Sequence, residues 1–236
     1  MRDAENIRAL EEQAKPDLMG FICWEHSPRY VNEVPTYLPK CRRVGVFVNP
    51  TLDYILERSK AFGFNYIQLH GNESPDFCQE VRQQTGLPVI KAFSIKNPTE
   101  GLETSPLWGG LVGSYEGLVD LFLFDTKGKS IGGNGEKFDW SVLESYHGIT
   151  PFLLSGGIGP EDVERLKEFF AKRSRNLTGD CPAASKCIGI DINSRFELAP
   201  GIKDVASVAR FMSSLSNSRK PSISKISGDS IDSSTS

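Results

Sequence analysis

The sequence lacks several features that would place it in other classes of protein. Its formal net charge is only −3 over 236 residues, so no basic surface indicates nucleic acid or an anionic membrane as a partner. No apolar run approaches the ~20 residues that a membrane-spanning helix needs. The N-terminus, MRDAENIRALEEQ, is charged and helical in character, unlike a secretory signal. We therefore expect no membrane and no nucleic-acid partner.

Cysteine is scarce, and its spacing excludes the common uses of this residue. The five cysteines are Cys23, Cys41, Cys78, Cys181 and Cys187. They form no CxxC pair and no paired Cys/His spacing, so we expect no metal site. An odd number of cysteines without a secretory signal indicates a reducing compartment, and a cytoplasmic location is expected.

What the chain does contain is a regular alternation of apolar strands and helices. Strands are predicted at residues 17–24, 43–48, 65–69, 87–93, 120–125, 151–155 and 186–192. Helices are predicted at residues 3–14, 51–62, 74–85, 140–146, 160–171 and 204–215, with Asp3 as a cap and Pro75 in a first turn. This alternation predicts a parallel β/α barrel within one domain, residues 1–215. A doubly wound open sheet is the alternative, disfavoured because no glycine-rich phosphate fingerprint follows an early strand.

Three segments break this alternation. Residues 97–117 are rich in Gly, Pro and Ser and are predicted to be a loop with a short helix. Residues 172–186 are polar and are predicted to be a surface insertion. Residues 216–236 form a Ser-rich tail with too few apolar residues to offset its ordering entropy, so this tail is predicted to be disordered.

Polar residues recur where the predicted strands end: Arg29, His70, Asp125, Gly156 and Asp191. In a β/α barrel these ends meet at one face, which carries the active site. Asp125 follows the apolar run Leu121–Phe124 and precedes a glycine-rich loop, so it is a candidate general acid, with a capping role as the alternative. His70 is a candidate ligand contact or a structural residue, and Arg29 a carboxylate or phosphate contact or a solvated loop residue.

Two late strand ends resemble a phosphate cradle. One is Ser155-Gly156-Gly157-Ile158, which precedes a helix, and the other is Asp191-Ile192-Asn193-Ser194. Glycines let backbone N–H groups approach an anion, and a helix N-terminus adds a favourable dipole. The alternative for Gly156-Gly157 is a tight turn without a ligand. A phosphate held by backbone groups needs no Lys or Arg, which suits this mildly acidic chain.

An ordered set of motifs, taken together, resembles one family. The motifs are SPRYV, VGVFVN, IQLHGNE, LFDT with GGNG and FDW, PFLLSGGI and GIDINSRFELAPGIKD. In this order they resemble phosphoribosylanthranilate isomerase of tryptophan biosynthesis, from the first helix to about residue 214. The resemblance implies a (β/α)8 barrel of the TIM type and an Amadori rearrangement. N-(5-phosphoribosyl)anthranilate becomes 1-(2-carboxyphenylamino)-1-deoxyribulose 5-phosphate, an aldose-to-ketose isomerisation without a metal or organic cofactor.

The resemblance also implies roles for individual residues. Asp125 is expected to be the general acid that protonates the ribose ring oxygen and opens the ring to a Schiff base. Arg29 is expected to face the anthranilate carboxylate. The remaining residues expected to contact the substrate are Gln68, His70 and Asp191, and those expected to hold its phosphate are Gly156, Gly157, Asn193 and Ser194. The resemblance leaves open whether the protein is a monomer or a homodimer.

One departure from the family pattern concerns the general base. In the family this base is a Cys followed by Gly at the end of the first strand, whereas Met1–Asn6 resembles the sequence just after that Cys-Gly. We therefore expect strand 1 and its Cys to be missing, seven strands to be present, and the true start to lie upstream. Cys23 lies in the second strand and is no substitute by position.

This departure keeps two other readings open. The first is a catalytically impaired remnant that binds phosphoribosyl ligands, and in that case this chain has little or no isomerase activity. The second is another phosphate-binding barrel enzyme such as indoleglycerol-phosphate synthase, disfavoured because it would need catalytic lysines at strand ends. Lys91 lies inside a predicted strand instead.

Overall fold

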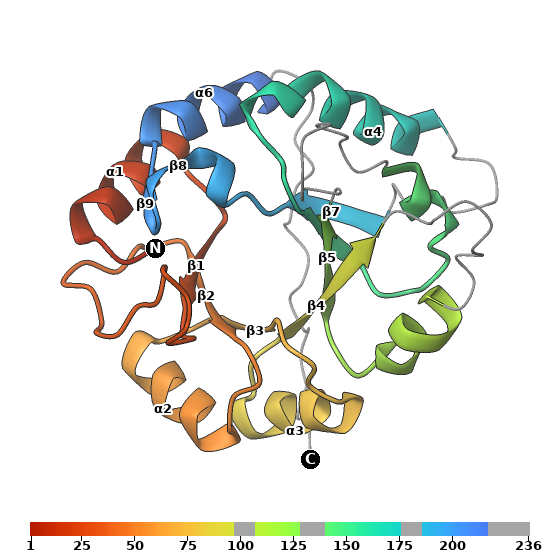
Figure 1. Ribbon diagram of the computed structural model, residues 1–236, viewed down its shortest axis with the longest axis horizontal. Helices are drawn as coiled ribbons and strands as arrows, with labels where there is room; N and C mark the ends of the chain where they lie inside the picture. The colour runs from red at the N-terminus through yellow and green to blue at the C-terminus, as the bar shows by residue number, and fades with distance from the viewer. Residues whose placement is uncertain (97–106, 128–139, 176–185, 217–236) are drawn as a thin grey trace, which may run out of the picture.

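Seven parallel strands form a curled sheet with helices around its outside (Figure 1). The computed structural model describes residues 1–96, 107–127, 140–175 and 186–216. Within these residues the strands pair in chain order, each with the next. They are β1 (Leu18–Ile22), β2 (Arg42–Phe47), β3 (Tyr66–Leu69), β4 (Val89–Lys96), β5 (Leu121–Lys127), β6 (Phe152–Ser155) and β7 (Cys187–Ile190). The predicted alternation and the parallel pairing are confirmed.

The sheet is most deeply buried at its inner strands and least at its two edges. All four residues of β3 and all four of β6 are buried, because each of these strands has a neighbour on both sides and packing on both faces. In β1 and β7 most residues are only half-buried. Among the described strands β1 has β2 as its one strand neighbour, apart from an isolated bridge from Ile22 to Tyr30, and β7 has only β6, so the ring is open between β7 and β1 (Figure 1).

Five α-helices cover the outside of the sheet in the described residues. They are α1 (Ala4–Ala14), α2 (Leu52–Phe62), α3 (Pro75–Thr85), α4 (Val163–Arg175) and α6 (Val205–Ser216). Their starts follow from capping, since the side chains of Asp3, Thr51 and Ser74 accept hydrogen bonds from the first turns of α1, α2 and α3. The predicted Asp3 cap and the predicted Pro75 in the first turn of α3 are confirmed.

The helical ring closes between the first and last of these helices. In Figure 1 α1 lies beside α6, and the hairpin of β8 (Glu197–Ala199) and β9 (Ile202–Lys203) lies next to α1. The Asn6 side chain joins α1 to β9: its amide donates to the Lys203 carbonyl at 2.9 Å and accepts from the Lys203 N–H at 2.8 Å. This contact spans 197 positions of sequence.

Two apolar clusters lie on the two faces of the sheet. Alternation along each strand sends every second side chain inward. The smaller, inner cluster contains Val44, Tyr66, Ile90, Ala92, Leu121, Leu123 and Leu153. The larger cluster packs the sheet against the helices and includes Phe21, Phe47, Phe62, Phe122, Phe124 and Phe152.

Several predicted segments differ from the structure. The surface insertion predicted from residue 172 is wrong at its start, because α4 continues to Arg175. The helix predicted from 160 begins as a 3₁₀ turn, η4 (Pro160–Asp162), and residues 140–145 are a 3₁₀ helix, η3 (Trp140–Ser145). The short helix expected within 97–117 is present as a π-helix, η1 (Leu107–Val112), followed by η2 (Gly113–Tyr115). The glycine loop at 128–139 and the tail from 217 lie outside the described residues, as do 97–106 and 176–185.

Among the described helices, none combines the length and the apolar character that crossing a bilayer requires.

Candidate active site

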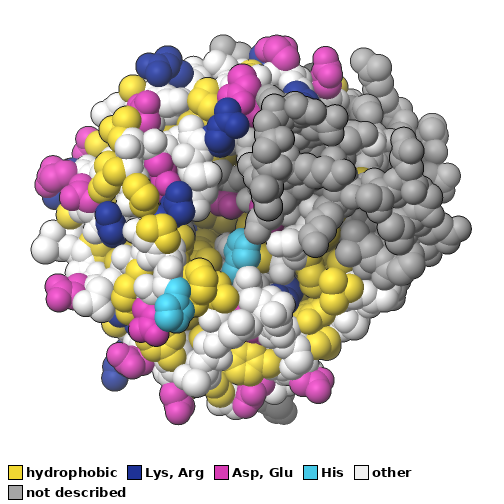
Figure 2. All heavy atoms as spheres, in the orientation of Figure 1, with side chains coloured by type: hydrophobic (Ala, Val, Ile, Leu, Met, Phe, Trp, Pro, Cys, Tyr) yellow, Lys and Arg dark blue, Asp and Glu magenta, His cyan; other side chains and the backbone are white. Residues whose placement is uncertain are grey.

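The inner rows of side chains continue past the inner cluster to polar groups at the carboxyl ends of the strands. Because side chains alternate, Gln68 shares the inward face with Tyr66, Asp125 with Leu123, and Ser155 with Leu153. The parallel register places Asp125 directly beside Ser155, on strands about 4.8 Å apart. Figure 2 shows hydrophobic side chains around the middle of this face with a His side chain among them.

His70 follows β3 and faces Asp125 on β5. The His70 Nε2 lies 3.7 Å from the Asp125 Oδ2, which is ion-pair distance and longer than a hydrogen bond. The side chain of Asp125 is 14% exposed and that of His70 is 31% exposed. The predicted general acid is therefore partly buried and next to an imidazole. The predicted end of its strand at Asp125 is wrong, because β5 continues to Lys127.

Gln68 fixes the orientation of the His70 ring. Its amide Nε2 lies 2.9 Å from the His70 Nδ1. An amide nitrogen only donates, so Nδ1 accepts this hydrogen bond and the ring proton of neutral His70 lies on Nε2. The imidazole thereby presents an N–H to Asp125. In this structure Gln68, expected to contact the substrate, contacts His70.

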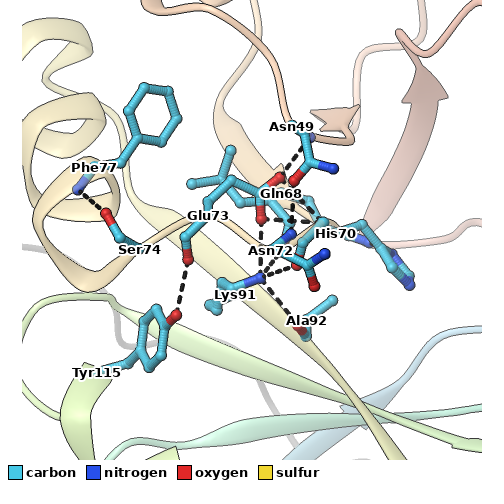
Figure 3. A network of polar contacts seen from close by, with 12 residues as sticks. Asn49, Gln68, His70, Asn72, Glu73, Ser74, Phe77, Lys91, Ala92 and Tyr115 are labelled. Carbon is cyan, nitrogen blue, oxygen red and sulfur yellow. Dashed lines mark hydrogen bonds and ion pairs between the residues drawn. The ribbon is translucent and has the colours of Figure 1, made fainter. Parts of the chain in front are cut away.

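The turn that carries His70 is built around a buried ion pair that sequence analysis did not assign (Figure 3). The Lys91 Nζ lies 2.9 Å from the Glu73 Oε2, and the two side chains are 2% and 1% exposed. Lys91 also donates to the Gly71 carbonyl at 2.7 Å. The signal was present in the sequence, because a lysine inside an apolar strand requires a buried partner. The structure agrees with the sequence that Lys91 is not at a strand end.

The second group of predicted residues follows β6. Gly156 and Gly157 have φ angles of 96° and 64°, in the range that favours glycine. A Cβ on Gly157 would meet no atom within 4 Å, so the turn has open space beside it. The chain then enters η4 and α4, with Pro160 at the first position of η4. Open space, glycine backbone and a following helix together suit an anion.

Asp191, Asn193 and Ser194 follow β7. The Asp191 Oδ2 accepts a hydrogen bond from the Ser155 Oγ at 2.9 Å, so the ends of β6 and β7 are joined. The Asn193 Oδ1 and carbonyl accept from the Lys203 Nζ at 2.6 and 3.0 Å. Ser194 is exposed and begins η5 (Ser194–Phe196). The acceptors of Asn193 thus contact Lys203, a residue that the sequence had not singled out.

Arg29 lies in the loop after β1 and binds a protein carboxylate. Its Nε donates to the Glu197 Oε2 at 2.8 Å, and its Nη2 lies 2.7 Å from the same oxygen. Glu197 also accepts from the Lys203 Nζ at 3.2 Å. Burial alone would raise the pKa of Glu197, but the hydrogen bond from Arg29 and the charge of Lys203 outweigh it and lower this pKa. The guanidinium edge that carries Nη1 lies outside this pair and can still receive a ligand carboxylate.

The predicted residues thus form two connected groups. Gln68 and His70 face Asp125, and Asp125 lies beside the Ser155–Asp191 contact that leads to the glycine turn. Arg29 and Asn193 are linked through Glu197 and Lys203. The sequence did not single out Glu197 or Lys203: Glu197 binds Arg29 across 168 positions, and Lys203 bonds to Glu197 and Asn193 without any recognised motif.

Neither a metal ion nor a reactive thiol is favoured by the described residues. They contain no group of three or more His, Cys, Asp or Glu side chains placed to share a metal. Cys23, directly after β1, is buried, and burial raises the pKa of its thiol. A thiol of this kind stays protonated, which makes it a poor base and agrees with its exclusion on position.

Comparisons with known proteins give the family. The family model described as N-(5'-phosphoribosyl)anthranilate (PRA) isomerase matches residues 2–214. The isomerase of Phocaeicola vulgatus is 44% identical over 216 residues, covering 91% of this chain and 94% of that protein. That of Parabacteroides distasonis is 40% identical over 219 residues, covering 90% and 89%. The crystal structure of phosphoribosyl anthranilate isomerase from Thermotoga maritima superimposes with a TM-score of 0.67 at 27% identity, covering 92% of this chain and 96% of that one. The chain belongs to the phosphoribosylanthranilate isomerase family.

Proposed function

We propose that this protein catalyses the Amadori rearrangement of N-(5-phosphoribosyl)anthranilate in tryptophan biosynthesis. The family match over residues 2–214 is the observation that carries the proposal. The relatives named as this isomerase are up to 44% identical to the chain among those described above, which favours the enzyme over a binding remnant. The position of Lys91, inside β4 and paired with Glu73, gives no support to a lysine-dependent barrel enzyme.

Asp125 is the proposed proton donor. A general acid must be within reach of the group it protonates and must be held in place. Asp125 lies partly buried near the carboxyl end of β5, beside the His70 imidazole and one strand away from the glycine turn. Protonation of the ribose ring oxygen by this carboxyl opens the ring to the Schiff base, and the same group then recovers a proton.

The two ends of the substrate are proposed to bind on either side of Asp125. The phosphate is assigned to the turn of Gly156 and Gly157 together with Asn193 and Ser194, because the glycine turn has open space and precedes a helix. The anthranilate carboxylate is assigned to the free edge of Arg29, which Glu197 holds from the other side. Asp191 is assigned to the ribose hydroxyls, with Gln68 and His70 on the side of the ring.

The reaction also needs a general base, which none of the residues assigned above supplies. The sequence carries no Cys-Gly at the end of a first strand, and the buried Cys23 is a poor base. We propose that an eighth strand belongs between β7 and β1, where it would close the barrel and bring the base to the same face. The half-buried residues of β1 and β7 support this place for it.

An isomerase assay on two versions of the protein tests the proposal. One is the 236-residue chain, and the other carries an added N-terminal strand that ends in Cys-Gly. We expect the extended version to turn over substrate and to lose this turnover on Asp125→Asn. Binding of a reduced product analogue without turnover by either version would favour the binding remnant. Full turnover by the Asp125→Asn variant would refute the assignment of the acid.

Location and assembly are proposed on chemical grounds. A substrate with a phosphate and a carboxylate does not cross a bilayer unaided, so we place the reaction in the cytoplasm, where the substrate would be made. A monomer or a homodimer remains the proposed assembly, and sedimentation of the purified protein distinguishes the two.

A further inference from the structure

The backbone on both sides of His70 is held by the Glu73–Lys91 ion pair. The carbonyl before His70, that of Leu69, accepts from the Lys91 Nζ at 3.4 Å. The N–H after it, that of Gly71, donates to both carboxylate oxygens of Glu73 at 3.0 Å. The His70 N–H itself donates to the Phe47 carbonyl at 2.8 Å. These contacts fix both peptide groups that flank His70 and therefore the direction of its side chain.

The same pair holds the turn from neighbouring elements (Figure 3). The Glu73 Oε1 accepts from the Asn49 N–H at 2.8 Å, which ties the loop after β2 to the turn. The Lys91 Nζ also donates to the Ala92 carbonyl at 3.2 Å. The Tyr115 hydroxyl donates to the Glu73 carbonyl at 2.8 Å from the far side. Glu73 and Lys91 thus tie the turn to the loop after β2, to β4 and to Tyr115.

Stability alone does not account for a pair buried this deeply. Removing two charges from water costs free energy that their attraction often fails to repay, and apolar residues of similar size often serve as well. What an apolar pair cannot do is bind several peptide groups in fixed directions at once. The Glu73–Lys91 pair does so at the one turn that carries the imidazole facing Asp125.

We propose that Glu73 and Lys91 are positioning residues for the reaction. They act through His70: they hold its ring so that Gln68 keeps the proton on Nε2 and this N–H faces Asp125. His70 then stabilises the carboxylate that remains each time Asp125 has given up its proton. This inference rests on the proposed role of Asp125 as the acid.

The double variant Glu73→Gln/Lys91→Met tests the proposal because it removes both charges and leaves none unpaired. The first readout is the ¹⁵N spectrum of the imidazoles at about pH 8, where histidine is neutral, with His26 and His147 as internal controls. In the natural chain we expect His70 in the Nε2–H form, and in the variant a mixture of both forms. The second readout is kinetic, in the active version of the enzyme: we expect kcat to fall about 10- to 100-fold with little change in KM.

Arg82→Met is the matched control. It removes the 2.9 Å pair of Arg82 with Asp120, which also joins α3 to the start of β5 but lies away from His70. We expect no change in the His70 spectrum or in kcat. A double variant that folds, keeps the Nε2–H form and keeps its kcat would overturn the proposal and leave the pair a purely structural role.

If the double variant does not fold, Tyr115→Phe tests whether the Glu73–Lys91 pair positions His70. It removes one hydrogen bond to the Glu73 carbonyl and leaves the ring and both charges in place. A shift of the His70 spectrum toward the mixed form, without change at His26 or His147, supports the proposal, and an unchanged His70 spectrum overturns it. The ¹⁵N spectrum does not depend on turnover, so it tests the positioning of His70 separately from the role of Asp125. Full activity of the Asp125→Asn variant would refute Asp125 as the acid without changing what the spectrum shows about His70.

Discussion

The turns after β3 and β6 both contain a glycine just past the carboxyl end of a fully buried strand, but the backbone requires glycine for a different reason in each. Gly71 has no positive φ, but a Cβ there would come within 2.7 Å of the Asn49 N and of the Glu73 Oε1. Gly157 has a φ of 64°, and a Cβ there would meet nothing within 4 Å. The first turn is filled by the protein, whereas the second is left open.

This difference separates the two tasks that the site must perform. A side chain that stabilises a reacting carboxylate has to be held still, and the filled turn holds His70 beside Asp125 through buried contacts. A bound group needs space, and the glycine turn has open space at Gly157, ahead of a helix. The comparison predicts that changes on the filled side affect turnover and changes on the open side affect binding.

The largest effect is expected at Asp125, on the side of the filled turn. Asp125→Asn removes the proposed proton donor but keeps its shape, so kcat should fall by about 10²- to 10⁴-fold in the active enzyme. The Kd of a reduced product analogue, measured by calorimetry, should stay nearly unchanged, because the open turn is intact. If analogue affinity fell as far as kcat, the separation of the two tasks would be wrong.

Gly71→Ala is expected to disturb the filled turn next most strongly. The added methyl overlaps the Asn49 backbone and the Glu73 carboxylate, so we expect the free energy of unfolding to fall by about 1–3 kcal/mol. Urea denaturation measures this loss, and kcat should fall with it because the backbone beside His70 moves. A loss below about 0.5 kcal/mol would show that the turn is not filled as described.

Gly157→Ala tests the open turn, and Gly86→Ala is its control. Gly86 ends α3 with the same φ of 64° and the same empty surroundings, but it lies outside the candidate site. Both substitutions should cost about 1–2 kcal/mol of stability from the left-handed backbone alone. Only Gly157→Ala should raise KM, because its methyl group enters the space assigned to phosphate. Equal KM values in the two variants would remove the phosphate from this turn.

The smallest expected effect is the pH dependence of stability that comes from Glu197, which binds Arg29 and Lys203. The pKa of Glu197 in the folded chain lies below its ordinary value of 4.5, so this group adds stability above about pH 4.5 and loses it as the pH falls through the folded pKa. Glu197→Gln should therefore lower the thermal midpoint of unfolding at neutral pH. It should also make this midpoint fall less steeply as the pH is lowered. Melting curves between about pH 3 and 7 check this. A decline as steep as that of the natural chain would exclude Glu197 as its source.

Much of this arrangement could be predicted from local patterns. Apolar runs of four to six residues located all seven strands, and the residue after each run located Asp125, His70 and the glycine turn, because strand ends converge on one face. Capping residues such as Asp3 located helix starts for the same reason, since a cap acts within one turn.

The rest depended on contacts between distant residues. Glu197 binds Arg29, which lies 168 positions away in the sequence, and no local pattern near either residue predicts this contact. The β8–β9 hairpin is short and half-exposed, so it lacks the apolar run that marks the other strands. Helix α4 continued to Arg175 because polar residues remain compatible with a helix whose apolar face is already buried. Local composition therefore located the candidate site but not the pairs that support it.

The hydrogen bonds between Asn6 and the Lys203 backbone bear on the order in which the protein assembles. They join the first helix to the turn before the last one, across 197 positions. During synthesis the first helix must wait for almost the whole chain to leave the ribosome before this partner exists. We expect closure of the helical ring to be a late event in folding, and a chain stopped before residue 203 to leave the Asn6 amide in water and the apolar side of α1 without its cover.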